Sequence, residues 1–232
     1  MPGEFDFGGA VPAWGRSAAE YEAFFALSDV PSTARVLDCG GGPSSFAAEW
    51  GVKGRSVVAV DPVYRFSGRK LEADFQSTSA RMLKGAREAY ARFVWDHYGS
   101  PEAVVRLRRN VLSTFLRDFR SATASGRYVA GQLPQLPFRS NSFDLVLCSH
   151  LLFLFSAEFD SETHESHLLE MLRVGREVRV FPLLDMAGKP SRHLDHTIQK
   201  MRDRADVEVV PVPFEFRRGD SNMLRLTKNG RG

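Results

Sequence analysis

A glycine-rich turn and an acidic residue downstream of it are the groups in this sequence best placed to bind a ligand. Residues 40–42 are glycines, which follow the apolar pair 36–37 and precede an apolar run that begins at Phe46. A strand that breaks into glycines and continues as a helix lets a nucleotide-like ligand approach the backbone, because glycine has no Cβ to block it. About 20 residues further on, Asp61 ends a second apolar run, where a carboxylate can accept hydrogen bonds from both ribose hydroxyls.

Each of these features also has a purely structural interpretation. A glycine-rich loop can serve packing alone, and Asp61-Pro62 is a common turn at the end of a strand. Together, at this spacing, they favour a bound nucleotide. Two ligands use the arrangement, dinucleotides and S-adenosylmethionine. The third glycine of the dinucleotide pattern would fall at Ser45, so that fingerprint is incomplete.

Residues 128–147 distinguish between the two ligands. They contain a Gly-Gln-Leu-Pro segment, then Leu-Pro-Phe, and then a Ser-Phe-Asp that opens a strand. With the glycine loop and Asp61, this block resembles the class I S-adenosylmethionine-dependent methyltransferases, over residues 34–228. The resemblance implies S-adenosylmethionine as the cofactor. It disfavours the alternative of a nicotinamide-dependent oxidoreductase.

The resemblance also implies which residues contact the cofactor. Asp38, Gly40 and Gly42 match the family motif Asp-x-Gly-x-Gly-x-Gly, which binds the methionine part, and Ser44 replaces the last glycine. Gln132 stands where the family often has an aspartate that bonds the adenine amino group, and its side-chain carbonyl can accept that bond. The full set implied is Asp38, Cys39, Gly40, Gly41, Gly42, Asp61, Pro62, Gln132, Leu133 and Ser149.

The elements that must position these residues alternate along the chain. A capping box at Ser17–Glu20 opens the first helix, and further helices are expected over 161–174 and 191–204. Such alternation predicts a doubly wound α/β fold. With the resemblance, it predicts a mostly parallel seven-stranded sheet that ends in an antiparallel hairpin. The expected strands are 35–38, 57–61, 128–130, 143–148, 177–183, 207–216 and 222–228.

One connection is too long for a simple crossover. Residues 65–127 show two stretches of helical apolar periodicity, so we expect a helical cap inserted after the second strand of a single domain, 1–232, with an N-terminal helical segment, 1–30. The insert holds 13 Lys/Arg and 6 Asp/Glu. This excess of positive charge fits either an anionic partner such as RNA or the solvated face of amphipathic helices. The second interpretation places on that face Arg106, Arg108, Arg109, Arg117 and Arg120.

A histidine is the candidate for proton transfer. His150 directly follows the fourth expected strand, where open α/β sheets bind ligands, and it can take a proton from an attacking hydroxyl, thiol or amine. A histidine held by backbone at a strand end is the equal alternative. Tyr64, Tyr21 and Arg16 are candidates for contacting the substrate, and an arginine at this point also suits a carboxylate such as the cofactor's own.

Two further pairs of histidines have helical spacing. His164 and His167 are three residues apart, as are His193 and His196. Such spacing suits a metal site. No ligand pattern completes either pair, so we expect solvated helix histidines and no metal.

Composition bounds the remaining possibilities. Of 232 residues, 43% are hydrophobic and 25% charged, which is ordinary for a globular protein. No apolar run approaches 18 residues, no secretory signal is visible, and two cysteines do not predict a disulfide scaffold. A cytoplasmic methyltransferase with a small-molecule acceptor is the main hypothesis. An RNA-directed methyltransferase or a non-catalytic nucleic-acid-binding module is the alternative, and the sequence identifies neither the acceptor nor the oligomeric state.

Overall fold

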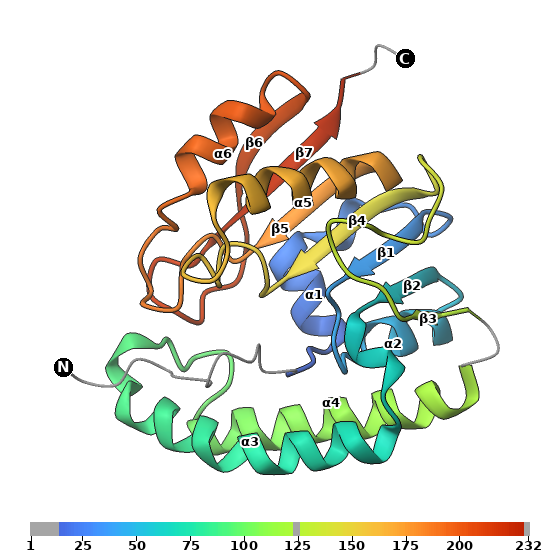
Figure 1. Ribbon diagram of the computed structural model, residues 1–232. Helices are drawn as coiled ribbons and strands as arrows, with labels where there is room; N and C mark the ends of the chain where they lie inside the picture. Colours follow the sequence, from blue (N-terminus) through green and yellow to red (C-terminus); the bar gives the residue numbers. More distant parts are fainter. Residues whose placement is uncertain (1–13, 123–125, 230–232) are drawn as a thin grey trace.

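A seven-stranded sheet forms the centre of the computed structural model, which describes residues 14–122 and 126–229 (Figure 1). The strand order is β3-β2-β1-β4-β5-β7-β6. β7 is antiparallel to both of its neighbours, and the other paired strands are parallel. This confirms the predicted sheet and its C-terminal hairpin. The strands are β1 (Arg35–Cys39), β2 (Ser56–Val60), β3 (Tyr128–Val129), β4 (Phe143–Ser149), β5 (Gly175–Phe181), β6 (Ala205–Pro211) and β7 (Asn222–Lys228).

Helices cover both faces of the sheet and create two separate cores. Successive residues of a strand point to opposite faces, so Leu145 and Leu147 of β4 pack on one side while Val146 and Cys148 pack on the other. The first side is covered by α1 (Ala18–Phe25), α2 (Phe46–Val52), α3 (Gly68–Glu88) and α4 (Pro101–Ala122). The second side is covered by α5 (Ser161–Val174) and α6 (Leu194–Met201). Short 3-10 turns lie at Leu27–Asp29, Pro62–Arg65 and Tyr90–Arg92.

The capping box that opens α1 is confirmed. The Ser17 side chain accepts a hydrogen bond from the Glu20 backbone N–H, and the Glu20 carboxylate accepts one from the Ser17 backbone N–H at 2.8 Å. These bonds satisfy backbone donors that the first turn of the helix leaves free. Tyr21, Phe24 and Phe25 then lie on the buried side of α1.

Residues 65–127 form the two expected long helices, which lie side by side (Figure 1). Proline at the start of α4 suits the first helical position, where its missing N–H costs nothing. Aromatic side chains from α4 pack against Tyr64 and Tyr128, so this segment is part of the first core. Residues 123–125 of the segment and residues 1–13 of the predicted N-terminal helical segment lie outside the described residues.

Three side chains that the sequence placed in solvent are buried. Arg108 is 3% exposed, and His164 and His167 on α5 are also buried, so the solvated face predicted for them is wrong. Periodicity assigns polar residues to the outside by default, but each of these side chains packs against other parts of the fold. His164, for example, lies against Phe153 and His193. Within the described residues, no helix is long and apolar enough to cross a membrane.

Candidate active site

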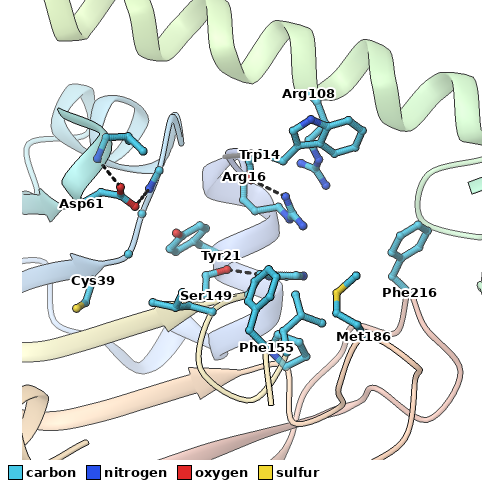
Figure 2. Close-up of a pocket in the computed structure, with 18 of the residues that line it drawn as sticks. Trp14, Arg16, Tyr21, Cys39, Asp61, Arg108, Ser149, Phe155, Met186 and Phe216 are labelled. Carbon is cyan, nitrogen blue, oxygen red and sulfur yellow. Dashed lines mark hydrogen bonds between the residues drawn. The ribbon is translucent and has the colours of Figure 1, made fainter. Parts of the chain in front are cut away.

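A cavity of about 580 Å³ opens at the carboxyl ends of the central strands. This is the edge at which open α/β sheets bind ligands. Its lining runs from the glycine loop after β1, past α3 and α4, to the loops after β5 and β6. Figure 2 shows Asp61 and Cys39 at one side of this space and Met186 and Phe216 at the other. We call the first side the cofactor end and the second side the acceptor end.

The glycine loop presents bare backbone to the cofactor end. Gly40 and Gly42 have φ angles of 73° and 55°, which residues other than glycine rarely adopt. A Cβ added to Gly42 would meet nothing closer than the Asp61 Oδ2 atom at 4.0 Å, so the space beside it is open. A Cβ on Gly41 would lie 2.3 Å from Asp38 Oδ2. A ligand can therefore approach the loop backbone closely on the side of Gly42, whereas Asp38 leaves no room for a side chain at Gly41.

Asp61 links the ends of the first two strands. Its Oδ2 atom accepts a hydrogen bond from the Gly42 N–H at 2.9 Å, and its Oδ1 atom accepts one from the Val63 N–H at 2.8 Å. Burial raises the pKa of this carboxyl, and the two N–H groups act against that rise. Each oxygen keeps a further lone pair for a donor such as a ribose hydroxyl.

Asp38 lies behind the glycine loop and not on the cavity surface. Tyr21 donates its hydroxyl hydrogen to Asp38 Oδ1 at 2.8 Å, while Asp38 Oδ2 has no hydrogen-bond partner among the described residues. Burial raises the pKa of Asp38 to about 7, opposed by the Tyr21 hydrogen bond and reinforced by Asp61. A cationic ligand bound on the other side of the glycine loop would favour the ionised form of this buried carboxyl, which has one unsatisfied oxygen.

A buried ion pair anchors α4, which lines one wall of the cavity, to α1. The Arg108 guanidinium on α4 donates to Glu20 at 2.7 Å, and Tyr98 donates its hydroxyl hydrogen to the same carboxylate. Burial opposes ionisation of Glu20, but Arg108 prevails and lowers the pKa of Glu20 to about 2. The carboxylate of the capping box thus also fixes α4 over the site.

Arg16 lies between the glycine loop and this ion pair. Its backbone carbonyl accepts hydrogen bonds from the Ser44 hydroxyl at 2.6 Å and from the Ser45 N–H at 3.1 Å. Its guanidinium donates to the Trp14 carbonyl at 2.7 Å, and its Nε atom has no partner among the described residues. Burial, together with the positive charge of Arg108, lowers the pKa of Arg16 to about 10. It stays cationic at neutral pH and faces the cavity (Figure 2).

His150 lies on the cavity wall at the end of β4. Its φ of 53° turns the chain out of the strand, and its backbone N–H donates to the Phe181 carbonyl at 2.6 Å. Its Nδ1 atom shares a hydrogen bond of 2.9 Å with the Ser149 hydroxyl. Burial and the charges of Arg16, Arg108 and Arg217 hold the pKa of His150 well below 6.5, so the imidazole is neutral at physiological pH.

The acceptor end is mostly apolar and aromatic. Phe93 and Phe216 stack with their ring centroids 4.6 Å apart, and Tyr98 meets Phe216 edge to face. The apolar side chains that line this part of the cavity are Met82, Ala86, Phe93, Val104, Val105, Leu154, Phe155, Met186, Phe214 and Phe216.

Two charged residues of the loop before β7 also line the acceptor end. Arg217 donates to the backbone carbonyls of Asp185 and Met186 at 2.9 and 2.8 Å. Asp220 is 4% exposed, and its Oδ1 atom has no partner among the described residues. Burial raises the pKa of Asp220 to about 7, against the opposing charge of Arg217.

The structure brings most of the predicted site residues to one cavity. Of the residues that the sequence assigned to the cofactor, all but Asp38 line it, and Tyr21, Arg16 and His150 line it too. Tyr64 is not in the lining. Its hydroxyl donates to the Gly42 carbonyl at 2.7 Å, so it supports the glycine loop from behind. No group of three or more potential metal ligands occurs within the parts of the chain that the structure describes.

Sequence reasoning missed the charged residues of the acceptor end. Arg108 follows the helical periodicity of a solvated side chain, and Asp220 sits in a Gly-Asp-Ser sequence typical of a turn. No local pattern separates either residue from an ordinary surface group. Only the packing of distant segments shows that both line the cavity.

Comparisons with known proteins agree with this architecture. Residues 85–177 match the family model described as a methyltransferase domain, a stretch that begins in α3 and ends in β5. This match accords with the methyltransferase resemblance that the sequence shows. The matched stretch includes Gln132, Leu133 and Ser149 but begins after the glycine loop and Asp61, so the geometry of these two features is independent of the match.

The chain is also similar to several individual proteins. The uncharacterized protein MJ0045 of Methanocaldococcus jannaschii is 26% identical over 215 residues, which are 92% of this chain and 95% of that protein. Magnesium protoporphyrin IX methyltransferase from Synechocystis, solved with bound S-adenosylmethionine, is 13% identical, with a TM-score of 0.46 over 91% of this chain and 78% of that one. A TehB-like methyltransferase from Corynebacterium glutamicum is 16% identical, with a TM-score of 0.47 over 90% and 87%.

The residues at the cofactor end fit S-adenosylmethionine, the cofactor that the sequence resemblance implies. The open side of Gly42 gives room for a ligand against the backbone, and Asp61 has lone pairs for ribose hydroxyls. The unsatisfied oxygen of Asp38 lies behind the same loop. The backbone of the glycine loop, the Asp61 carboxylate and the open space beside Gly42 are therefore close together, as the binding of a nucleoside joined to a cationic amino acid requires.

Proposed function

We propose that this methyltransferase acts on a small molecule held at the acceptor end of the cavity. The observation that carries the proposal is the shape of the lining: α3 and α4 form a wall of Met82, Ala86, Val104 and Val105 opposite the loops that follow β5 and β6. A walled, mostly apolar space suits a small ligand, which it can desolvate and orient.

The cofactor end would hold S-adenosylmethionine through the residues named from the sequence. We assign Asp61 to the ribose hydroxyls, the backbone of residues 40–42 to the methionine part, and Gln132 with Leu133 to the adenine. Arg16 is assigned to the cofactor's carboxylate, because it is cationic, faces the cavity and has an unpaired Nε atom. Asp38 would act through Tyr21 and the loop as a positioning residue.

Catalysis would need orientation more than covalent help from the protein. When bound, the cofactor supplies an activated methyl group on a sulfonium. The apolar walls would exclude water, and alignment of the acceptor with the methyl group can contribute several kcal/mol. His150 and Ser149 would contact the acceptor at the boundary between the two ends, since both line the cavity there.

Thermal unfolding with three ligands in parallel tests the cofactor assignment. At a hundred times its dissociation constant, a ligand stabilises by about 2.7 kcal/mol, or roughly 5–11 °C for a domain of this size. We expect a shift with S-adenosylmethionine and with S-adenosylhomocysteine, and none with NAD. Arg16→Gln should weaken both sulfur ligands but leave adenosine binding unchanged. Equal loss for adenosine would remove Arg16 from the carboxylate role.

The surface of α4 supports a second acceptor class. The ion pairs made by described residues of α4 involve Glu102, Arg108 and Asp118. The arginines on its outer face are exposed and make no ion pair with the described residues; they are Arg106, Arg109, Arg117 and Arg120. Such a stripe favours an anionic partner, and an RNA acceptor is the alternative hypothesis.

The salt dependence of RNA binding decides between the two acceptor classes. An RNA acceptor predicts binding of a structured RNA whose affinity falls steeply with salt and drops when Arg106 and Arg109 become glutamine. Weak binding that is unaffected by those substitutions would leave the small molecule as the acceptor.

A further inference from the structure

The aromatic and apolar side chains at the acceptor end indicate which class of ligand it can bind. Phe93 and Phe216 are stacked at an interplanar angle of 23°, and Phe155 and Met186 face the same space. Val104 and Val105 of α4 complete the wall. Aromatic rings and a thioether bind planar apolar molecules well, because such guests cover large areas without leaving polar groups unpaired.

Most charged groups at this end already have partners within the protein. Arg108 is held by Glu20, and the Arg217 guanidinium is held by two backbone carbonyls. Asp220 differs, because its Oδ1 atom has no partner among the described residues although the side chain is buried. A buried carboxylate oxygen left in this way is stabilised by a ligand that brings a hydrogen-bond donor.

Burial acts in opposite directions on the protonation of the two candidate proton acceptors of the cavity. A proton on His150 would create a buried cation near Arg16, Arg108 and Arg217, all of which oppose it. A proton on Asp220 would remove a buried negative charge. Burial and Glu215 favour this change and Arg217 and the Leu183 backbone oppose it; burial prevails and raises the pKa of Asp220 to about 7. The sequence predicts His150 for the role, but the surroundings favour Asp220.

On the basis of the proposed function, we propose that the acceptor is a flat, apolar compound with an O–H or N–H nucleophile, and that Asp220 accepts the proton of that group. The bond from the nucleophile to the methyl carbon would form as the carbon–sulfur bond breaks. The electron pair of the broken bond stays on sulfur, and the proton passes to the Asp220 carboxylate. No further reactant is needed, so atoms and charges balance.

A matched pair of probes tests this in the full-length chain with S-adenosylhomocysteine bound. 2-Naphthol carries the hydroxyl, and 2-methoxynaphthalene has the same flat body without it. We expect 2-naphthol to bind at least tenfold more tightly, and its fluorescence to show emission from naphtholate formed by proton transfer to a neighbouring carboxylate. Asp220→Asn should abolish that emission and bring the two affinities within about threefold.

Asp203→Asn is the control variant. Asp203 is exposed and does not line the cavity. It should keep both the emission and the tenfold preference. Equal binding of the two probes to the wild-type protein would overturn the proposal without any variant. So would naphtholate emission that survives in Asp220→Asn but is lost in His150→Gln.

The same titrations separate failure of this inference from failure of the proposed function. Binding of S-adenosylhomocysteine without binding of either naphthalene would overturn the flat, apolar acceptor and leave the cofactor assignment intact. Absence of S-adenosylhomocysteine binding would overturn the proposed function itself.

Discussion

The two ends of the cavity are built in different ways. At the cofactor end, the lining comes mainly from short segments that directly follow β1, β2 and β3. The Gly42 N–H donates to the Asp61 carboxylate, and the Asp61 N–H donates to the Val129 carbonyl, so the three segments are joined by hydrogen bonds to backbone groups. At the acceptor end, the lining comes from α3, α4, the segment between them and two loops of the C-terminal half. These segments touch by backbone at a few points, such as the Val94 N–H on the Phe216 carbonyl at 2.7 Å, but they face the cavity mainly with side chains.

This difference shows what each end requires of the sequence. A backbone cradle needs glycine and a carboxylate at set positions after strands, so it leaves a local motif. A chamber of apolar side chains needs only volume and shape, which many combinations of residues satisfy. The cofactor end should therefore be sensitive to single polar changes, and the acceptor end, apart from Asp220, should respond mainly to changes of volume.

The largest effect is expected where the two ends are joined. Glu20→Gln leaves the Arg108 guanidinium buried without a carboxylate, and breaking a buried ion pair in this way costs about 3–5 kcal/mol. Denaturant unfolding should show that loss. The double variant Glu20→Gln, Arg108→Gln should recover part of it, because neither buried charge is then left alone. A loss below about 1 kcal/mol in the single variant would mean that α4 is not anchored by this pair.

The next effect is confined to the cofactor end. Asp61→Ala removes the acceptor of the Gly42 and Val63 N–H groups and the proposed ribose ligand. We expect affinity for S-adenosylhomocysteine to fall at least a hundredfold, or about 2.7 kcal/mol, in titration calorimetry. The exposed Asp203→Ala is the control. Retained affinity in Asp61→Ala would break the assignment of this end.

A pH-dependent effect should come from Asp38. Its pKa is about 7 in the fold against 3.8 ordinarily, so between those values the folded protein holds a proton that the unfolded chain releases. Stability therefore falls as pH rises from 5.5 to 7, by about 2 kcal/mol from this group at 1.36 kcal/mol per unit.

Unfolding of Asp38→Asn at both pH values measures this contribution. The variant should lose that slope, since asparagine does not titrate and still accepts from Tyr21. The buried histidines His164 and His167 titrate in both proteins and cancel in the comparison. The exposed Asp203→Asn should keep the wild-type slope. Parallel slopes for Asp38→Asn and the wild type would show that Asp38 is already ionised at pH 5.5.

The smallest effect should separate the two ends. Val105 lines the acceptor end, and Val105→Trp would fill part of it. We expect 2-naphthol to bind about tenfold more weakly, or about 1.4 kcal/mol, while affinity for S-adenosylhomocysteine changes less than twofold. Val52→Trp, at an exposed position away from the cavity lining, should change neither affinity. Equal losses for both ligands in Val105→Trp would mean that the ends are not independent.

Much of the architecture could be read from local patterns. Buried parallel strands appear as apolar runs such as 57–60, and Ser17–Glu20 marks the start of α1, because these signals depend only on neighbouring residues. Boundaries were less well predicted: the helix expected over 191–204 is only Leu194–Met201. The hairpin could be placed because its two strands adjoin in the chain and the family resemblance supplied their pairing.

The side chains that meet across the cavity could not be read in the same way. Arg108 pairs with a residue 88 positions away, and helical periodicity cannot indicate such a partner. Tyr64 was expected at the substrate, but its hydroxyl bonds the glycine loop from behind. Both outcomes depend on how α4 and the Pro62–Arg65 turn pack against elements remote in sequence.

The sequence by itself determined the order of strands and helices, the bare backbone of residues 40–42 and the position of Asp61, because each depends on residue type at a short, set spacing. Only the tertiary structure decided that Arg108 is an internal cation and that Asp220 is a buried carboxyl beside an aromatic chamber. The physical reason is that burial and the charges around a group alter its chemistry, and both come from segments far away in the chain.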